Sequence, residues 1–380
     1  MQFLCRTLIL GAVLLSLIGC NTNVTPPPIL IGHVSDKTRL DRAGDQTELG
    51  IRLALSEIQK DGSAPEGLGG RKIEVRHTDT RGELAAYESQ SVRLDAVNRC
   101  MALLGGLSAK EVTALDHVKT PILTFHGQPV SGASNEVFYL GMAPSHEGEV
   151  LAEVVAEDAK RKQVVILQDE RRSAATTFTE SFQKALAEAR AKAKMEPCTV
   201  VVLRFNKQVE WSEVVPRIDS QKPNAIVFAG GVEDFNAWHK IFSRDSGAVD
   251  SQIVFAGNDG SAAMFDLNDV KASVLLTTTF YADPASAKIE AFIKTYKAAF
   301  HTEPDVHSAL AYDGFRMLVE AMKKSGTQLT PERIREELAK TKDFDGLTGP
   351  LTINADRQVQ RPLFVVRWQK GTLALHGKPR

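Results

Sequence analysis

The chain is poor in the residues on which several classes of function depend. Aromatic residues make up 7% of its 380 positions, and only three of them are tryptophan, so no stripe of rings is available to stack nucleic-acid bases. Positive charge is not in excess, because 46 Lys and Arg face 47 Asp and Glu. We therefore expect no nucleic-acid partner and no electrostatic attraction to an anionic membrane.

Cysteine is also scarce, with four residues at positions 5, 20, 100 and 198. There is no CxxC pair and no Cys/His group with ligand spacing, and His301 and His307 lack a third partner in sequence, so no metal is predicted. Cys100 and Cys198 lie in separate apolar runs that we place in different lobes. A disulfide between them is arithmetically allowed, but two separate buried thiols are the better prediction.

Motifs of enzymes and cofactor sites are absent or misplaced. Ser181 and Lys184 have the SxxK spacing of a penicillin-binding nucleophile, but they fall in a long amphipathic helix pattern. Gly106 to Lys110 lacks the final glycine of a nucleophile elbow, and no Walker loop or GxGxxG is present. We expect neither an enzyme nor a cofactor.

The first residues follow the pattern of an export signal. Residues 7 to 19 are apolar and too short to span a bilayer comfortably, and they end in Leu17-Ile18-Gly19-Cys20, which resembles the bacterial lipobox. We predict a signal peptide over 1–19, a lipid on Cys20 and a proline-rich tether over 20–28. A signal anchor that stays, or a signal cut elsewhere, is the alternative. The lipid would hold an exported protein at a membrane, in the periplasm or on the cell surface.

Beyond the tether, short continuous apolar runs alternate with amphipathic stretches of helical period. This order predicts an α/β fold with parallel sheets covered by helices. Strands are predicted at 29–34, 72–77, 101–104, 122–125, 164–167, 200–204, 225–228, 253–255 and 274–278, and helices at 45–59, 83–98, 147–159, 176–191 and 233–242.

The alternation of strands and helices over 29–125 recurs at 163–256, which indicates two Rossmann-like lobes of similar build. Helices then follow at 285–300, 306–324 and 331–340, and two strand-like runs flank Asn354-Ala355-Asp356. These late elements imply that the chain crosses between the lobes more than once and so forms a multi-strand hinge. A small ligand would sit in the cleft between such lobes.

Seven segments, in order along the chain, resemble the type I periplasmic binding proteins of the branched-chain amino acid (Leu/Ile/Val-binding) family. They are Ile31-Gly32 with Gly50-Ile51-Arg52-Leu53-Ala54-Leu55-Ser56-Glu57-Ile58, Gly69-Gly70-Arg71-Lys72-Ile73, Leu104-Gly105-Gly106-Leu107-Ser108, Thr120-Pro121-Ile122-Leu123-Thr124, Phe255-Ala256-Gly257-Asn258-Asp259-Gly260, Ala311-Tyr312-Asp313-Gly314, and Phe344-Asp345-Gly346-Leu347-Thr348-Gly349-Pro350-Leu351.

The resemblance implies the solute receptor of an ABC importer, which closes on its ligand and delivers it to a membrane permease. It implies a first lobe of 29–142 plus 281–346 and a second lobe of 143–280 plus 347–380. Closure reports occupancy because a ligand touching both lobes stabilises the closed state by its differential affinity.

The resemblance also implies binding residues at matching positions. Ser108 matches a serine that holds a ligand carboxylate, and Asp259 matches an acidic residue that pairs with a ligand ammonium group. After the fourth strand, His126 and Gln128 stand where the family has small residues and a threonine. Val232 replaces a common tyrosine.

Aromatic walls expected in the family are therefore missing, and a leucine-sized side chain would lose apolar surface to bury. Arg172, with Arg39, Arg42 and Arg171, lies on loops that the family places near the cleft mouth, where a guanidinium suits a second carboxylate; solvated loop charge is the alternative. The ligand is thus expected to be an amino acid or an amino-acid-like solute. A sensing receptor with a membrane partner, or a scaffold with a degenerate pocket, remains open.

Overall fold

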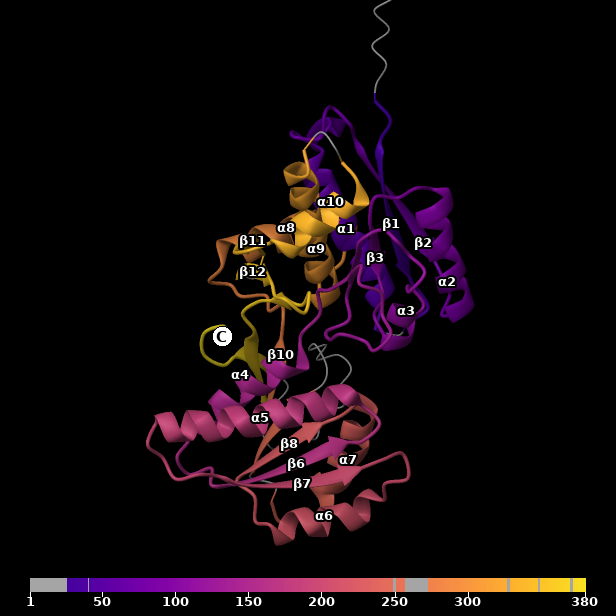
Figure 1. Ribbon diagram of the computed structural model, residues 1–380. Coiled ribbons are helices and arrows are strands. Elements are labelled where there is room, and N and C mark those ends of the chain that lie inside the picture. The colour runs from indigo at the N-terminus through magenta and orange to yellow at the C-terminus, as the bar shows by residue number, and fades with distance from the viewer. Residues whose placement is uncertain are drawn as a thin grey trace, which may run out of the picture.

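The computed structural model describes residues 26–39, 41–248, 251–256, 273–326, 329–347, 349–369 and 372–380. Two α/β lobes lie one above the other, joined at a middle level where the C-terminus also lies (Figure 1). Among the described residues, no helix has both the length and the apolar character that a membrane crossing requires. The predicted signal, Cys20 and most of the tether fall outside the described residues.

The first lobe is built on a parallel sheet of five strands in the order β2-β1-β3-β4-β5. Its strands are short and mostly apolar, as expected of strands with helices on both faces. They span Ile29–Ser35 (β1), Ile73–Asp79 (β2), Leu103–Gly105 (β3), Ile122–Thr124 (β4) and Val137–Tyr139 (β5).

The second lobe contains a sheet of seven strands in the order β15-β14-β10-β9-β8-β6-β7. The five strands from β6 to β10 run parallel, whereas β14 pairs antiparallel with β10 and with β15. The bounds are Gln163–Asp169 (β6), Thr199–Phe205 (β7), Ala225–Ala229 (β8), Gln252–Ala256 (β9), Val274–Thr278 (β10), Phe364–Gln369 (β14) and Thr372–Leu375 (β15).

Helices cover both sheets. Those of the first lobe are α1 (Ala43–Ile58), α2 (Leu84–Val92), α3 (Ala109–Thr113), α8 (Ala287–Phe300), α9 (Val306–Lys324) and α10 (Pro331–Ala339), with one 3₁₀ turn at Lys60–Gly62 and one π turn at Arg93–Val97. Those of the second are α4 (Pro144–Ala156), α5 (Ser173–Lys192), α6 (Trp211–Ser220) and α7 (Val232–Asp245). Every predicted helix and strand is present, which confirms the α/β fold with two lobes; α6, with Pro216 inside it, was not predicted.

Three described segments cross between the lobes, at 140–143, 279–286 and 361–363. Arg361, which is buried, donates from Nη2 to the carbonyl of Leu140 at 2.8 Å and so ties the third crossing to the first. The carbonyl of Arg361 lies 3.1 Å from Nε2 of His146 on α4. The hinge is therefore held by polar contacts between segments more than 200 residues apart.

A small antiparallel sheet stands beside the hinge, formed by β11 (Phe344–Gly346), β12 (Gly349–Ile353) and β13 (Val359–Gln360). Its first hairpin is fixed by Asp313 of α9, whose buried carboxylate accepts from the backbone N–H of Leu347 at 2.8 and 3.0 Å. The lobe boundary predicted at 346 to 347 falls inside this hairpin. The chain returns to the seven-stranded sheet at Phe364.

Both later cysteines are free thiols. Cys100 is buried and Cys198 half-buried, and burial raises the pKa of the Cys100 thiol to about 11. Cys100 packs among residues of the first lobe and Cys198 against residues of the second. The prediction of two separate thiols is confirmed, with Cys198 more exposed than expected.

Candidate functional site

The loop after β4 is held directly against the first crossing segment. A Cβ on Gly127 would lie 1.9 Å from the carbonyl oxygen of Met142, so only glycine allows the two backbones to approach this closely. The side chain of Gln358, from the small sheet, donates to the carbonyl of Gly127 at 3.3 Å. The loop that carries His126 and Gln128 is thus fixed at the hinge end of the first lobe.

Gln128 makes a direct contact with the second lobe. Its Nε2 donates to Oγ of Ser173, the first residue of α5, at 2.9 Å. His126, two residues earlier, has a buried Nε2 without a hydrogen-bond partner among the described residues. Burial holds the pKa of this imidazole below its ordinary value of 6.5, so His126 is neutral at pH 7. A neutral imidazole can offer a donor or an acceptor to a bound solute.

Arg172 and Val232 meet at the same end of the second lobe. A Cβ on Gly231, the residue before α7, would lie 2.6 Å from a terminal guanidinium nitrogen of Arg172. The Arg172 side chain is 52% exposed and its Nε lies 3.3 Å from a carboxylate oxygen of Asp169. Val232 is 7% exposed and adds little accessible apolar surface. Arg172 therefore offers an accessible guanidinium at this end of the second lobe.

Two of the three other arginines expected near the cleft, Arg171 and Arg39, are held in internal ion pairs. Arg171 binds both carboxylate oxygens of Asp169 at 2.7 and 2.8 Å, and it also contacts Asp234. Burial would raise the pKa of Asp169, but the hydrogen bonds from Arg171 outweigh it and hold that pKa below its ordinary value. Arg39 pairs with Asp41 in the same two-pronged way. Arg42 is the N-cap residue of α1 in a left-handed conformation, but it is exposed and its side chain makes no capping hydrogen bond.

Ser108 is the N-cap residue of α3 and forms a capping box with Glu111. The Glu111 carboxylate oxygen Oε2 accepts from the backbone N–H groups of Leu107 and Ser108 at 2.8 and 2.9 Å, and the Ser108 hydroxyl lies 3.1 Å from it. These are the donors that the family resemblance assigns to a solute carboxylate. In this structure a carboxylate of the chain itself binds them.

The predicted residues of the first lobe lie on neighbouring loops. The carbonyl of Gly106 accepts from the backbone N–H of Phe125 at 3.0 Å, which joins the loop before Ser108 to the loop that carries His126. Through Gln128 and Ser173 these loops reach Arg172. The structure thus brings five of the six predicted binding residues to the facing ends of the two lobes. Asp259 lies outside the described residues, as does Cys20.

Two contributing residues were missed at the sequence level. Glu111 could have been found, because Ser108-Ala109-Lys110-Glu111 is the S-x-x-E pattern of a capping box. Ser173 carries no such signal, since its role arises only when the lobes are assembled.

A cavity beside the hinge lies away from these residues. It measures about 490 Å³ and is lined by the first and third crossings and by the small sheet, including His146, Gln358 and Arg361. None of the predicted binding residues within the described part of the chain lines it. The candidate site is thus defined by the residues at the facing lobe ends and not by this cavity.

Comparison with known proteins identifies the class. A family model described as periplasmic binding protein matches residues 28–372, nearly the whole chain. The chain therefore belongs to the periplasmic binding protein family, as the seven segments predicted.

Solved structures with the same fold include branched-chain amino acid receptors. The branched-chain amino acid transporter substrate binding protein LivJ from Streptococcus pneumoniae, in complex with isoleucine, is 22% identical with a TM-score of 0.72, over 93% of this chain and 100% of that one. An ABC transporter substrate-binding protein from Desulfitobacterium hafniense with Leu is 18% identical with a TM-score of 0.73, over 92% and 100%. A solute binding protein from R. palustris, in complex with benzoate, is 19% identical with a TM-score of 0.66, over 92% and 96%.

Proposed function

We propose that this protein is the solute receptor of an ABC importer and that it captures an amino acid or an amino-acid-like solute between its lobes. Membership of the periplasmic binding protein family supports this proposal. The lobes are further proposed to close about the three crossings, and the lipid on Cys20 to hold the protein beside its permease. No covalent chemistry is part of this function.

The observation that carries the proposal is the contact between Gln128 and Ser173. It joins a loop of the first lobe to the start of α5 in the second, at 2.9 Å, and it lies next to Arg172 in sequence. A solute between these loops would touch both lobes, and only such a ligand can favour the closed arrangement. The unpartnered Nε2 of His126 supplies a polar group on the first-lobe side.

The solute is proposed to carry a carboxylate. Isoleucine, leucine and benzoate, bound by the three structural relatives, share this group. In this chain the solute carboxylate can use the donors around Ser108 only if Glu111 withdraws, because the Glu111 carboxylate binds them. Arg172 offers a second place for it, since its side chain is half exposed and a guanidinium group can pair with a carboxylate in two-pronged geometry. Asp259 is proposed to bind an ammonium group of the solute.

The first test is thermal unfolding of the purified protein against amino acids, aromatic carboxylates, dicarboxylates and amides. A ligand at a hundred times its dissociation constant stabilises the native state by about 2.7 kcal/mol, enough to raise the unfolding temperature by several degrees. We expect a shift with one class of carboxylate solute. No shift with any solute would contradict the proposal and favour a scaffold or a protein-facing receptor.

Two variants then locate the solute. Arg172→Ala should weaken solute binding at least tenfold. Arg244→Ala is the control and should leave binding unchanged, because Arg244 is an exposed arginine in the last turn of α7, whereas Arg172 lies beside the start of that helix. Glu111→Gln keeps a hydrogen-bond acceptor for the cap but removes the negative charge. It should tighten binding about tenfold if the solute carboxylate approaches Ser108. Unchanged binding in both variants would remove both proposed carboxylate positions.

A further inference from the structure

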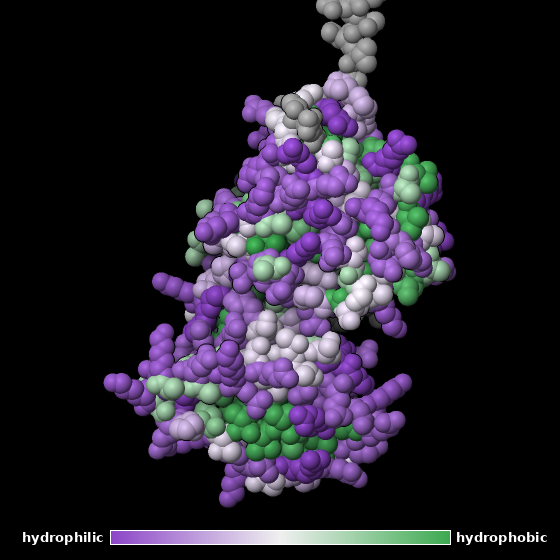
Figure 2. Space-filling model, in the orientation of Figure 1, coloured by the Kyte–Doolittle hydropathy of each residue, from purple (hydrophilic) through white to green (hydrophobic). Residues whose placement is uncertain are grey.

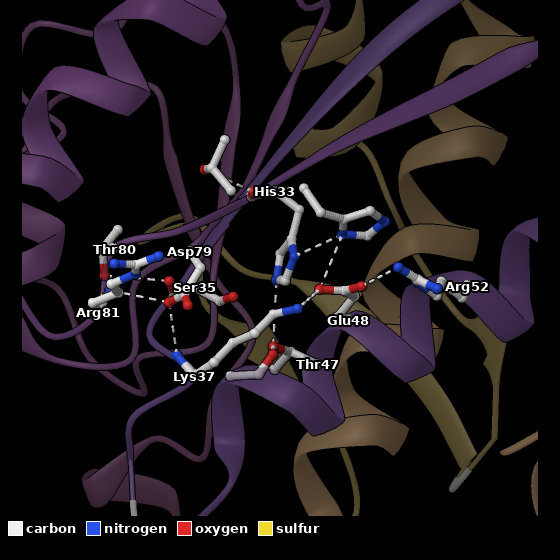
Figure 3. A network of polar contacts seen from close by, with 12 residues as sticks. His33, Ser35, Lys37, Thr47, Glu48, Arg52, Asp79, Thr80 and Arg81 are labelled. Atoms are coloured by element: carbon white, nitrogen blue, oxygen red, sulfur yellow. Dashed lines mark hydrogen bonds and ion pairs between the residues drawn. The ribbon is translucent and has the colours of Figure 1, made fainter.

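Two histidines and a glutamate meet in the first lobe, although they come from separate elements. His33 lies on β1 and His77 at the matching position of the parallel neighbour β2. Glu48 projects from α1 toward His33 (Figure 3). Their ligand atoms all lie within 4.8 Å of one another. Sequence spacing gives no sign of this His33–Glu48–His77 cluster, because 15 and 29 positions separate its members. We propose that the cluster binds a zinc-like transition-metal dication, independently of the proposed solute function.

The distances suit a shared metal with modest movement. Nδ1 of His33 lies 3.0 Å from Nδ1 of His77, and the latter lies 4.0 Å from Oε2 of Glu48. Ligands at 2.0 to 2.2 Å from a tetrahedral zinc ion stand about 3.3 Å apart. The two imidazoles are therefore nearly in place, and Oε2 of Glu48 has to approach Nδ1 of His77 by less than about 1 Å. Two histidines with a glutamate form a ligand set that zinc uses, with a fourth position left for water.

The surroundings of the cluster already orient the ligands. The Thr47 hydroxyl donates to the carbonyl of Gly44 at 3.1 Å, so its oxygen is assigned as acceptor from His33 Nε2 at 3.3 Å. That assignment leaves the Nδ1 lone pair of His33 directed at His77. Arg52 holds the other oxygen of Glu48. Such contacts behind the ligands are what fixes tautomer and orientation in metal sites.

A cation already stands beside the glutamate. The ammonium of Lys37 lies 2.6 Å from Oε2 of Glu48, the oxygen that faces the histidines, and Figure 3 shows Glu48 between Lys37 and Arg52. Lys37 is 35% exposed and His77 18% exposed, so the ammonium can leave to solvent and a metal can enter by the same side. Burial also lowers the pKa of His77 to about 4, which keeps its imidazole neutral, the form that binds metals. The metal would thus take the place of the Lys37 ammonium.

The test is a calorimetric titration of the untagged full chain, stripped of metal by a chelator, with Zn²⁺. We expect one equivalent to bind, and Co²⁺ to give the visible absorption of a four-coordinate site. His77→Gln should weaken Zn²⁺ binding at least a hundredfold and remove the Co²⁺ band. His117→Gln changes an exposed histidine beside acidic groups and should alter neither.

Lys37→Gln gives the decisive readout, because it removes the ammonium that competes for Glu48 and leaves all three proposed ligands unchanged. Zn²⁺ affinity should rise about tenfold, a change that a purely structural network would not produce. Absence of Zn²⁺ binding in both the wild type and Lys37→Gln would overturn the proposal. Unchanged Zn²⁺ affinity in His77→Gln would also overturn the proposal. His77 is the residue to change because it is partly exposed, and the buried His33 then stays in place to preserve the fold.

Discussion

Asp313 gives the protein a dependence of stability on pH whose sign and size follow from its surroundings. The carboxyl group is 1% exposed, and burial raises its pKa from 3.8 to about 6 in spite of the N–H of Leu347 and the nearby arginines. A carboxyl group whose pKa is higher in the native state than in the unfolded state binds its proton more tightly in the native state. The contribution of Asp313 to stability is therefore greatest below about pH 4 and is lost as pH rises through about 6.

The size of this effect is about 3 kcal/mol, the free energy that corresponds to moving a carboxyl pKa from 3.8 to about 6. Asp313→Asn keeps the shape and one acceptor for the N–H of Leu347 but cannot titrate. Between about pH 4 and pH 7 the wild type should lose about 3 kcal/mol more unfolding free energy than the variant. Groups that titrate in both proteins cancel in this comparison.

Urea unfolding at a series of pH values measures the difference directly. Asp345→Asn serves as the control, since that carboxyl group lies in the same hairpin but its side chain is 90% exposed, and it should follow the wild type closely. If the difference between the wild type and Asp313→Asn stays constant across the range, Asp313 is not the titrating group and the reasoning fails.

Three further substitutions test other parts of the molecule. Gly50→Ala places a Cβ 2.2 Å from the carbonyl oxygen of Ser308, so the α1–α9 contact should lose about 1 to 3 kcal/mol in urea unfolding; an unchanged midpoint would contradict that packing. Tyr296→Phe leaves the buried Oε1 of Gln46 without its hydrogen-bond donor at 2.5 Å and should lower the free energy of unfolding by about 1 to 3 kcal/mol in the same assay. An unchanged free energy of unfolding would show that water replaces the hydroxyl. Cys20→Ala should move the protein from the membrane to the soluble fraction of cells; retention at the membrane would refute lipid anchoring.

Most of the fold could be predicted because buried parallel strands are continuous apolar runs. Val164 to Leu167 and Ala225 to Phe228 are such runs, and both are central strands. The elements that were missed lack a local signal. Val137–Tyr139 forms a strand of only three residues, and α6 continues through Pro216. The pairing of β14 with β10 joins segments some 90 positions apart, which no local pattern reveals.

The site was less predictable, because the partner of each polar side chain depends on assembly. Arg171 and Arg172 are neighbours in sequence, yet the first is bound by Asp169 and Asp234 while the second is half exposed. Sequence could not separate them. The contact between Gln128 and Ser173 likewise exists only where two lobes face each other.

Glu111 shows why a matched position need not keep its chemistry. Ser108 stands after β3 as the resemblance requires, and its backbone N–H does bind a carboxylate, but that carboxylate belongs to the residue three positions later. A helix start with this internal partner is satisfied without ligand, so binding an anion there means exchanging one charge-assisted hydrogen bond for another. Such an exchange yields little net affinity. Selection among solutes should therefore depend more on groups whose partners are incomplete, namely His126 in the first lobe and Arg172 in the second.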